Sequence, residues 1–131
     1  MGLVRFHLGS SRRINRIDIL GNYNTFDNMK IIYNKIIPFD GYKYINLFGI
    51  IFSRSKNISP EDLNHEAIHT AQMKELLYIF FYIWYIIEYI IRFLFTWKNP
   101  YRKMLFEKEA YNNQDNLNYL SYRKHYQWLK N

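Results

Sequence analysis

The longest stretch of the chain without glycine or proline lies between Pro60 and Pro100, and it limits most strongly what the chain can fold into. Just before it, Ser59 is a good N-cap, Pro60 suits the first helical position, and two acids follow at the positive end of a helix. A helix is therefore predicted to begin at Pro60. A last helical stretch is predicted from Tyr101 to about Trp128.

Two runs rich in β-branched and aromatic residues precede this helical part. The first is Met29–Phe39, and the second, Tyr42–Arg54, follows an Asp-Gly turn. Two such runs around a Pro-Phe-Asp-Gly turn are typical of a β-hairpin. Gly49 interrupts the second run, where it is expected to mark a bulge or a close backbone approach. We therefore predict an α+β fold, with a small β-hairpin or sheet from about Met29 to Arg54 and then three helical segments.

The length of 131 residues fits one domain with its own hydrophobic core. Residues 1–28 are polar and rich in asparagine, and residues 29–131 are predicted to form the single domain. Met1–Arg13, which contains Gly-Ser-Ser, is treated as a leader outside the fold. Met1–Gly21 lacks the apolar run of a signal peptide, so a cytoplasmic protein is expected.

The chain carries a formal net charge of +7 and contains no cysteine. A basic balance suits nucleic acid or an anionic membrane as partner. The basic residues are scattered, however, apart from Arg12-Arg13 and Arg16, and no basic run alternates with aromatics as in RNA-binding motifs. We therefore expect no nucleic-acid partner. Without cysteine, any metal ion must be held by histidine and carboxylate.

Leu76–Trp97 is apolar and has the length of a membrane span. Glu88 and Arg92 argue against a span, because charges in mid-bilayer are costly and these two stand where a helix would pair them. Many of its residues are aromatic, which suits a protein core or an interface. A buried core helix packed against the hairpin and the last helix is favoured, with a helix peripheral to the membrane surface as the main alternative.

The residues that indicate chemistry are His65-Glu66-Ala67-Ile68-His69, within the predicted helix. Residues four apart share a helix face, so both imidazoles can reach one metal ion. Glu66 lies about 100° around the helix, where a base can take a proton from water beside the metal. Gln72 lies on the histidine face and could orient a ligand or line a cleft. The alternative is two surface histidines spaced by coincidence.

Zinc needs a third protein ligand and, for catalysis, an open fourth position. The best candidate is Glu107, because Ala110 would let its helix approach the histidine helix closely. Tyr111 lies four residues after Glu107, and Glu109 points to the other side. The alternatives are that Glu107 only forms salt bridges, or that His125 is the third ligand.

Joining Glu107 to the two histidines requires a bend. A straight helix from His69 to Trp97 would extend roughly 42 Å at about 1.5 Å per residue. The segment from Trp97 to Glu107 can return at most about 33–36 Å even when fully extended. We therefore predict a kink or turn between Met73 and Glu88, although no glycine or proline marks it.

His65-Glu66-x-x-His69 followed later by Glu107-x-x-Ala110 resembles the gluzincin class of zinc metallopeptidases, whose smallest members, the minigluzincins, are about this short. The resemblance implies a minimal zincin-like domain, with zinc bound by the two histidines and Glu107 and water activated by Glu66. It also implies an edge strand that aligns a peptide substrate, here Gly49–Arg54. The part Asn34–Trp128 also resembles an uncharacterised family of small bacterial proteins.

The chain departs from the gluzincin pattern in two ways. The acid that usually follows the alanine is replaced by Tyr111, so the support of the metal ligands differs. Larger members also carry a separate lobe with a group that stabilises the oxyanion. The candidates for that group in this chain are Tyr119, Tyr122 and His125.

These observations favour a zinc-dependent metallopeptidase that hydrolyses peptide bonds with Glu66 as general base. One alternative is a non-catalytic module in which zinc ties helices together. Another is a membrane-associated module that uses Leu76–Trp97 as an anchor. Glu66 favours the enzyme, because a structural zinc site has no need of a base.

Overall fold

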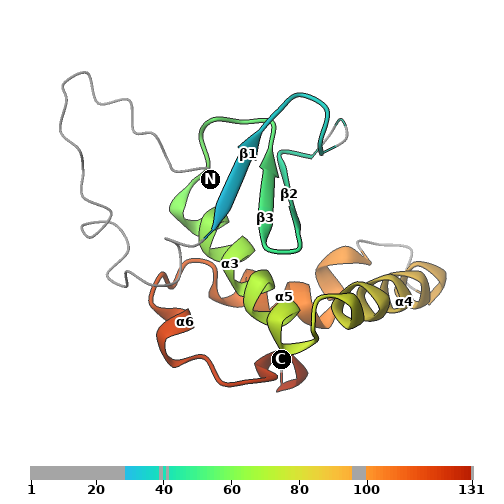
Figure 1. The fold of residues 1–131 in the computed structure, drawn as a ribbon. Helices are drawn as coiled ribbons and strands as arrows, with labels where there is room; N and C mark the ends of the chain where they lie inside the picture. The colour runs from blue at the N-terminus through green and yellow to red at the C-terminus, as the bar shows by residue number, and fades with distance from the viewer. Residues whose placement is uncertain (1–28, 39, 41, 96–99, 131) are drawn as a thin grey trace.

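The computed structural model describes residues 29–38, 40, 42–95 and 100–130. It contains a small sheet followed by helices, so the predicted α+β fold is confirmed (Figure 1). The predicted polar segment, residues 1–28, and the end of the predicted stretch Leu76–Trp97 lie outside the described residues.

The sheet has three strands, β1 (Lys30–Tyr33), β2 (Tyr44–Leu47) and β3 (Ile50–Ser53), in the order β1-β3-β2. The central strand β3 pairs in parallel with β1 and antiparallel with β2. The predicted hairpin between the runs Met29–Phe39 and Tyr42–Arg54 is therefore wrong. Instead, the second run folds back on itself, and the first run joins it as a parallel strand.

The turn between β2 and β3 explains this difference. Phe48 and Gly49 have positive φ angles of 53° and 80°, which suit a two-residue hairpin turn. The Gly49 N–H donates to Asn46 Oδ1 at 3.1 Å, which closes the turn. Gly49 therefore forms a hairpin turn and not the expected bulge. The alternative, a close backbone approach, is not seen either, because a Cβ at Gly49 would meet only side-chain atoms, the nearest being Thr70 Cγ2 at an ordinary 3.5 Å. The expected edge strand Gly49–Arg54 is also wrong, because β3 lies in the middle of the sheet and β2 lies at its edge.

Helix α3 (Pro60–Glu75) begins at the predicted residue. Ser59 Oγ accepts a hydrogen bond from the Asp62 N–H at 3.1 Å, as expected of an N-cap. Every residue from Leu63 to His69 is buried, although many of them are polar. Burial of this helix therefore depends on partners for its polar groups.

The edge strand β2 supplies one such set of contacts. Asn46 Nδ2 donates to Glu66 O and to Thr70 Oγ1, both at 2.8 Å, and so holds α3 against the sheet. The apolar side chains between sheet and helix form one core cluster. Its buried members are Ile51, Ile58, Leu63 and Ala67.

Helix α4 (Ile79–Phe95) follows α3 at an angle of 111°, so the predicted bend between Met73 and Glu88 is confirmed. Leu77 and Tyr78 form the bend with positive φ angles of 51° and 61°. The Tyr78 N–H donates to Met73 O at 2.7 Å, a bond that terminates a helix in Schellman-type ends. Such ends usually carry glycine, and its absence explains why no local residue marks the bend.

The predicted burial of Leu76–Trp97 is wrong for most of its described residues, because Phe81 is the only buried residue of α4. Glu88 and Arg92 are paired as predicted, with Arg92 Nε 2.7 Å from Glu88 Oε1. In the described ranges no single helix is long and apolar enough to cross a membrane, although the bent pair α3 and α4 together has the length and composition of a broken span. The exposed large apolar residues of α4 are Ile79, Phe80, Ile83, Trp84, Ile86, Ile87, Tyr89, Ile90, Ile91, Phe93, Leu94 and Phe95.

The predicted last helical stretch is broken into short helices. They are η1 (Tyr101–Lys103), α5 (Leu105–Asn113), α6 (Tyr119–Tyr122) and η2 (Gln127–Lys130). Trp128 of η2 is buried, and its ring centroid lies 4.6 Å from that of Phe106 in α5. Met73 and Phe81 belong to the same core cluster, which joins α3, α4, α5 and η2.

Candidate metal centre

The structure brings His65, His69 and Glu107 together, as the spacing of the motif predicts. The two Nε2 atoms lie 3.0 Å apart, and they lie 3.4 Å (His65) and 3.3 Å (His69) from the Glu107 carboxylate. All three side chains are buried, and their ligand atoms lie within 4.8 Å of one another. The histidines come from α3 and the glutamate from α5, so packing of these two helices forms the cluster. These residues could hold a metal ion.

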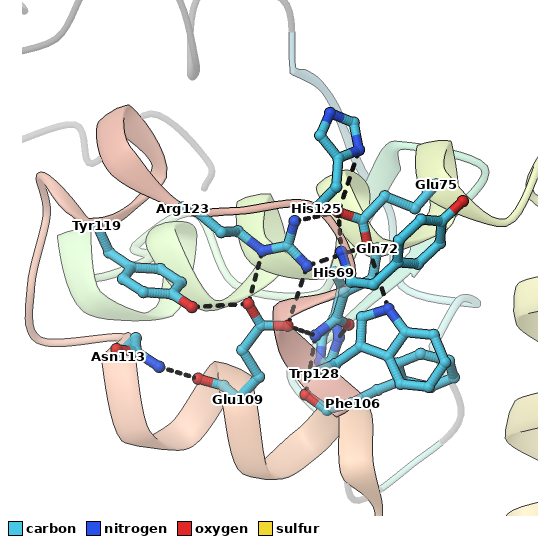
Figure 2. Close-up of polar contacts among 11 residues, drawn as sticks. His69, Gln72, Glu75, Phe106, Glu109, Asn113, Tyr119, Arg123, His125 and Trp128 are labelled. Atoms are coloured by element: carbon cyan, nitrogen blue, oxygen red, sulfur yellow. Dashed lines mark hydrogen bonds and ion pairs between the residues drawn. The ribbon is translucent and has the colours of Figure 1, made fainter. Parts of the chain in front are cut away.

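Gln72 fixes the orientation of His69. The Gln72 amide nitrogen donates to Phe106 O at 3.1 Å and to Glu109 Oε2 at 2.8 Å, so the amide oxygen faces His69 (Figure 2). This oxygen lies 2.8 Å from His69 Nδ1, which therefore donates the hydrogen bond. The lone pair of a neutral His69 is then on Nε2, directed toward His65 and Glu107.

Gln114 has the corresponding position at His65, with its Oε1 3.0 Å from His65 Nδ1. The loop that carries Gln114 is held by Asn64, whose Nδ2 donates to the backbone carbonyls of Asn113, Gln114 and Asn116 at 2.8–3.1 Å. Each imidazole is therefore supported by an amide oxygen at Nδ1. When both imidazoles are neutral, the Nε2 lone pairs of His65 and His69 point at each other and repel, unless a cation lies between them.

The charges of the cluster are strongly coupled. Burial alone would raise the pKa of Glu107, but the charge of His69 and hydrogen bonds from both histidines lower it below its usual range. Burial lowers the pKa of His69, but Glu107 and then Glu66 outweigh this effect and raise the pKa to about 9. A proton on His69 thus balances Glu107 in the metal-free cluster. The contact of Glu107 Oε2 with His65 Nε2, at 3.4 Å, is long, and this buried oxygen has no well-formed hydrogen bond among the described residues, so it can accept a cation.

Glu66 lies beside the cluster of His65, His69 and Glu107 and lines the same cleft as His69 and Glu107. Burial raises its pKa, and the nearby histidines oppose this effect. The cleft has a volume of about 410 Å³ and is bounded by β2 on one side and by α4 and Tyr101 on the other. It is large enough for one or two side chains of a substrate next to the cluster.

The other predicted site residues fall into two groups. Tyr111 packs edge-on against His65 at 4.7 Å between ring centroids, and the Arg102 guanidinium lies 4.6 Å from the Tyr111 ring. Tyr111 therefore supports the cluster by packing, whereas the acid that it replaces would do so by hydrogen bonding.

The predictions for Tyr119, Tyr122 and His125 as oxyanion groups are wrong, because none of them lines the cleft. Tyr119 donates to Glu109 at 2.8 Å, and Tyr122 accepts from Asn116 on the surface. His125 is exposed beside Glu75, which also excludes it as the third ligand (Figure 2).

Sequence reasoning missed the tyrosines of the cleft. Tyr85 donates to Glu107 Oε1 at 3.0 Å and so holds this carboxylate in place. Tyr82 and Tyr101 also line the cleft. The signal was present, because Tyr78, Tyr82, Tyr85 and Tyr89 recur at helical spacing, but the apolar residues all around α4 obscured this face.

Glu109 points away from the metal centre, as predicted, into a buried network around Arg123 (Figure 2). Arg123 pairs with Glu109 and with Glu75 of α3, and Trp128 Nε1 donates to Glu75 Oε2 at 3.1 Å. Gln72 hydrogen-bonds both to Glu109 in this network and to His69 in the candidate metal centre, so it connects the two.

Comparison with protein-family models, curated proteins and solved structures found no match to this chain.

Proposed function

We propose that this protein is a zinc-dependent hydrolase that cleaves peptide bonds. The observation that carries the proposal is the cluster itself, in which two imidazoles and one carboxylate converge while Glu66 stands beside them in an open cleft. The resemblance to gluzincins assigns the same roles to these residues. His65, His69 and Glu107 would hold the zinc ion.

The spacing of the ligand atoms fits zinc. Tetrahedral coordination with bonds of about 2.0–2.1 Å separates neighbouring ligand atoms by roughly 3.3–3.4 Å. The two Nε2 atoms lie 3.0 Å apart, and each lies at a similar distance from one oxygen of the Glu107 carboxylate, 3.4 Å from Oε2 for His65 and 3.3 Å from Oε1 for His69. Two imidazoles held by amide oxygens at Nδ1 are also the usual support of zinc ligands. The donor set of two nitrogens and one carboxylate is that of catalytic zinc sites.

The mechanism follows from the positions of the side chains. Bound zinc supplies Lewis acidity, which lowers the pKa of a water molecule and polarises a carbonyl group. Glu66 takes the proton of the attacking water and later delivers it to the leaving amine. Burial raises the pKa of Glu66 in the metal-free cluster, and the charge of a bound zinc ion would oppose this effect.

The free edge of β2 suits an extended peptide. Within the described sheet β2 pairs with β3 on one side, and its residues Tyr44 to Leu47 line the cleft. An added strand would be held by backbone hydrogen bonds, with alternate side chains entering the cleft. The strand that the gluzincin resemblance assigns to substrate alignment is therefore β2 in this proposal.

A structural zinc site is the second candidate, favoured by the deep burial of all three ligands. Structural sites are closed by four protein ligands. Among the described residues, the cluster contains three histidine or carboxylate side chains. This count favours the catalytic site.

The test combines metal analysis with peptide cleavage. Protein purified without chelator is analysed for zinc and then assayed on a library of fluorescence-quenched peptides. We expect cleavage by the wild type and a loss of about 10²–10⁴-fold in Glu66→Gln, with zinc retained. Glu61→Gln, in the first turn of the same helix and away from the cleft, is the matched control and should cleave normally. Stoichiometric zinc without cleavage by the wild type would support the structural site instead.

A further inference from the structure

Helix α4 has an apolar surface that the rest of the described protein leaves uncovered. Twelve of its 17 residues are large apolar side chains with exposed fractions from 40% to 81%. In Figure 1 the helix projects away from the sheet and from α3. Exposed apolar surface of this extent on a soluble protein usually marks an interaction site.

The exposed surface extends around most of the helix. The residues that face the protein recur at helical spacing and include Phe81, Tyr82, Tyr85 and Glu88. On the rest of its circumference, α4 exposes isoleucine, leucine and aromatic side chains along its whole length. A single protein partner, such as a second copy of this helix, would cover a stripe roughly 100° wide. The hydrocarbon tails of a lipid bilayer would instead cover the whole exposed surface of the helix.

The two charged groups of α4 pair with each other, which lowers the cost of their contact with lipid. Glu88 accepts from Arg92 Nε at 2.7 Å and from the Leu105 N–H at 2.9 Å, so its charge is paired on the protein side of the helix. Among the described residues of α4, Glu88 and Arg92 are the only charged ones.

A long groove runs beside the same helix. Its volume is about 790 Å³, and its lining reaches from Leu76 to Phe95, with Leu105 also in the wall. From Phe80 to Phe95 this lining follows α4 for roughly 22 Å at about 1.5 Å per residue, less than the hydrocarbon core of about 30 Å but longer than one of its two leaflets. Apart from the Glu88–Arg92 pair, which also contributes to it, the lining is apolar, so the groove suits lipid chains that lie along the helix.

Charge supports the same partner. The chain carries a net charge of +7. Arg102 and Lys103 are exposed in η1, which contacts α4. Basic side chains beside an inserted apolar helix attract anionic lipid headgroups.

We infer that α4 inserts into the surface of an anionic lipid membrane and anchors the protein there. Helix α4 extends about 26 Å at about 1.5 Å per residue, shorter than a hydrocarbon core of about 30 Å. It therefore inserts at an angle or along the interface, while α3 keeps its polar residues in the protein. This inference does not depend on whether the metal centre is catalytic.

The experiment is flotation of the full chain with vesicles of phosphatidylcholine alone or mixed with phosphatidylglycerol. We expect binding to the mixed vesicles that partly resists high salt, because both charge and apolar insertion contribute. Ile86→Glu combined with Ile90→Glu should reduce binding by about tenfold or more, because two acids would enter the apolar region. The matched control is Ile36→Glu combined with Tyr122→Glu, two exposed residues outside α4.

Two results would overturn the inference. One is that the wild type binds neither kind of vesicle, or that the control variant loses binding as much as the α4 variant. The other is that light scattering shows a dimer that the α4 variant abolishes while vesicle binding is unchanged, which would make α4 an interface between two copies. Circular dichroism and zinc content of each variant confirm that it is folded before either result is interpreted.

Discussion

Helices α3 and α4 are consecutive in the chain, yet each reverses the usual relation between polarity and burial. Helix α3 buries Asn64, His65, Glu66, His69 and Gln72, whereas α4 exposes nearly all of its isoleucine and phenylalanine side chains. The difference is in what surrounds them. Polar groups of α3 meet matching polar groups from β2, α5 and the C-terminal segment, while α4 has protein on one narrow side. Burial in this protein therefore follows the available partners more closely than hydropathy.

The largest expected effect tests whether the burial of α3 depends on its paired charges. Arg123→Met should lower the free energy of unfolding by about 3–5 kcal/mol, because Glu75 and Glu109 would remain as buried, unpaired carboxylates. Urea denaturation measures the change. Arg54→Met is the control, because its partner Asp40 is 93% exposed and such pairs contribute about 1 kcal/mol or less. Equal losses in the two variants would contradict the argument.

A smaller effect is expected at Gln72, which supports both His69 and Glu109. Gln72→Ala should weaken zinc binding by about 10–100-fold, because His69 loses the oxygen that holds its tautomer. Competition with a chromogenic chelator measures the affinity. Gln114→Ala should cost less, since Gln114 is half-buried and water can replace its oxygen at His65. The reverse order would show that the buried amide is not the main support.

The metal centre should also respond to pH. Because Glu107 raises the pKa of His69 to about 9, zinc binding at pH 7.5 should displace about one proton. Calorimetry in buffers of different ionisation enthalpy measures this release, and the part of it that comes from His69 should fall as the pH rises through about 9.

The same shift affects the stability of the metal-free protein. The folded-state pKa of His69, about 9, exceeds the value of about 6.5 for an unfolded histidine. The stability that it contributes is therefore complete below about pH 6.5 and is lost as the pH rises through about 9. Metal-free protein that becomes more stable between pH 7 and 9 would contradict this assignment.

The smallest effect is expected on the exposed side of α4. Ile90→Gln should change the free energy of unfolding by about 0.5 kcal/mol or less, because Ile90 is 50% exposed. Phe81→Ala in the same helix should cost about 3–5 kcal/mol, because Phe81 is buried in the core. Thermal denaturation in the absence of lipid compares the two variants. A large loss in Ile90→Gln would mean that this surface is covered in solution.

Much of the metal centre could be predicted from the sequence because its signals are local. Ser59 and Pro60 start a helix by contacts within one turn, and the spacing of His65 and His69 places both on one face whatever the surroundings. Glu107 could be predicted because Ala110 would let its helix approach the histidine helix. The bend then followed from chain geometry, since after a straight helix the chain could not reach from Trp97 back to the histidines. The direction of Glu109, away from the metal centre, and the pairing of Glu88 with Arg92 could also be predicted from helical periodicity.

Only the tertiary structure decided the rest. Strand pairing was mispredicted because an apolar run specifies a strand but not its partner, and the Phe48-Gly49 turn determined that the second run would pair with itself. The roles of Gln114, Tyr85 and His125 depend on contacts between segments more than 20 residues apart. The exposure of α4 also depends on the tertiary structure. The sequence shows that the helix is apolar, but the bend at Leu77 and Tyr78, with their positive φ angles, directs it away from the core. Local periodicity is encoded within a few residues, whereas burial depends on which distant surfaces the chain brings together.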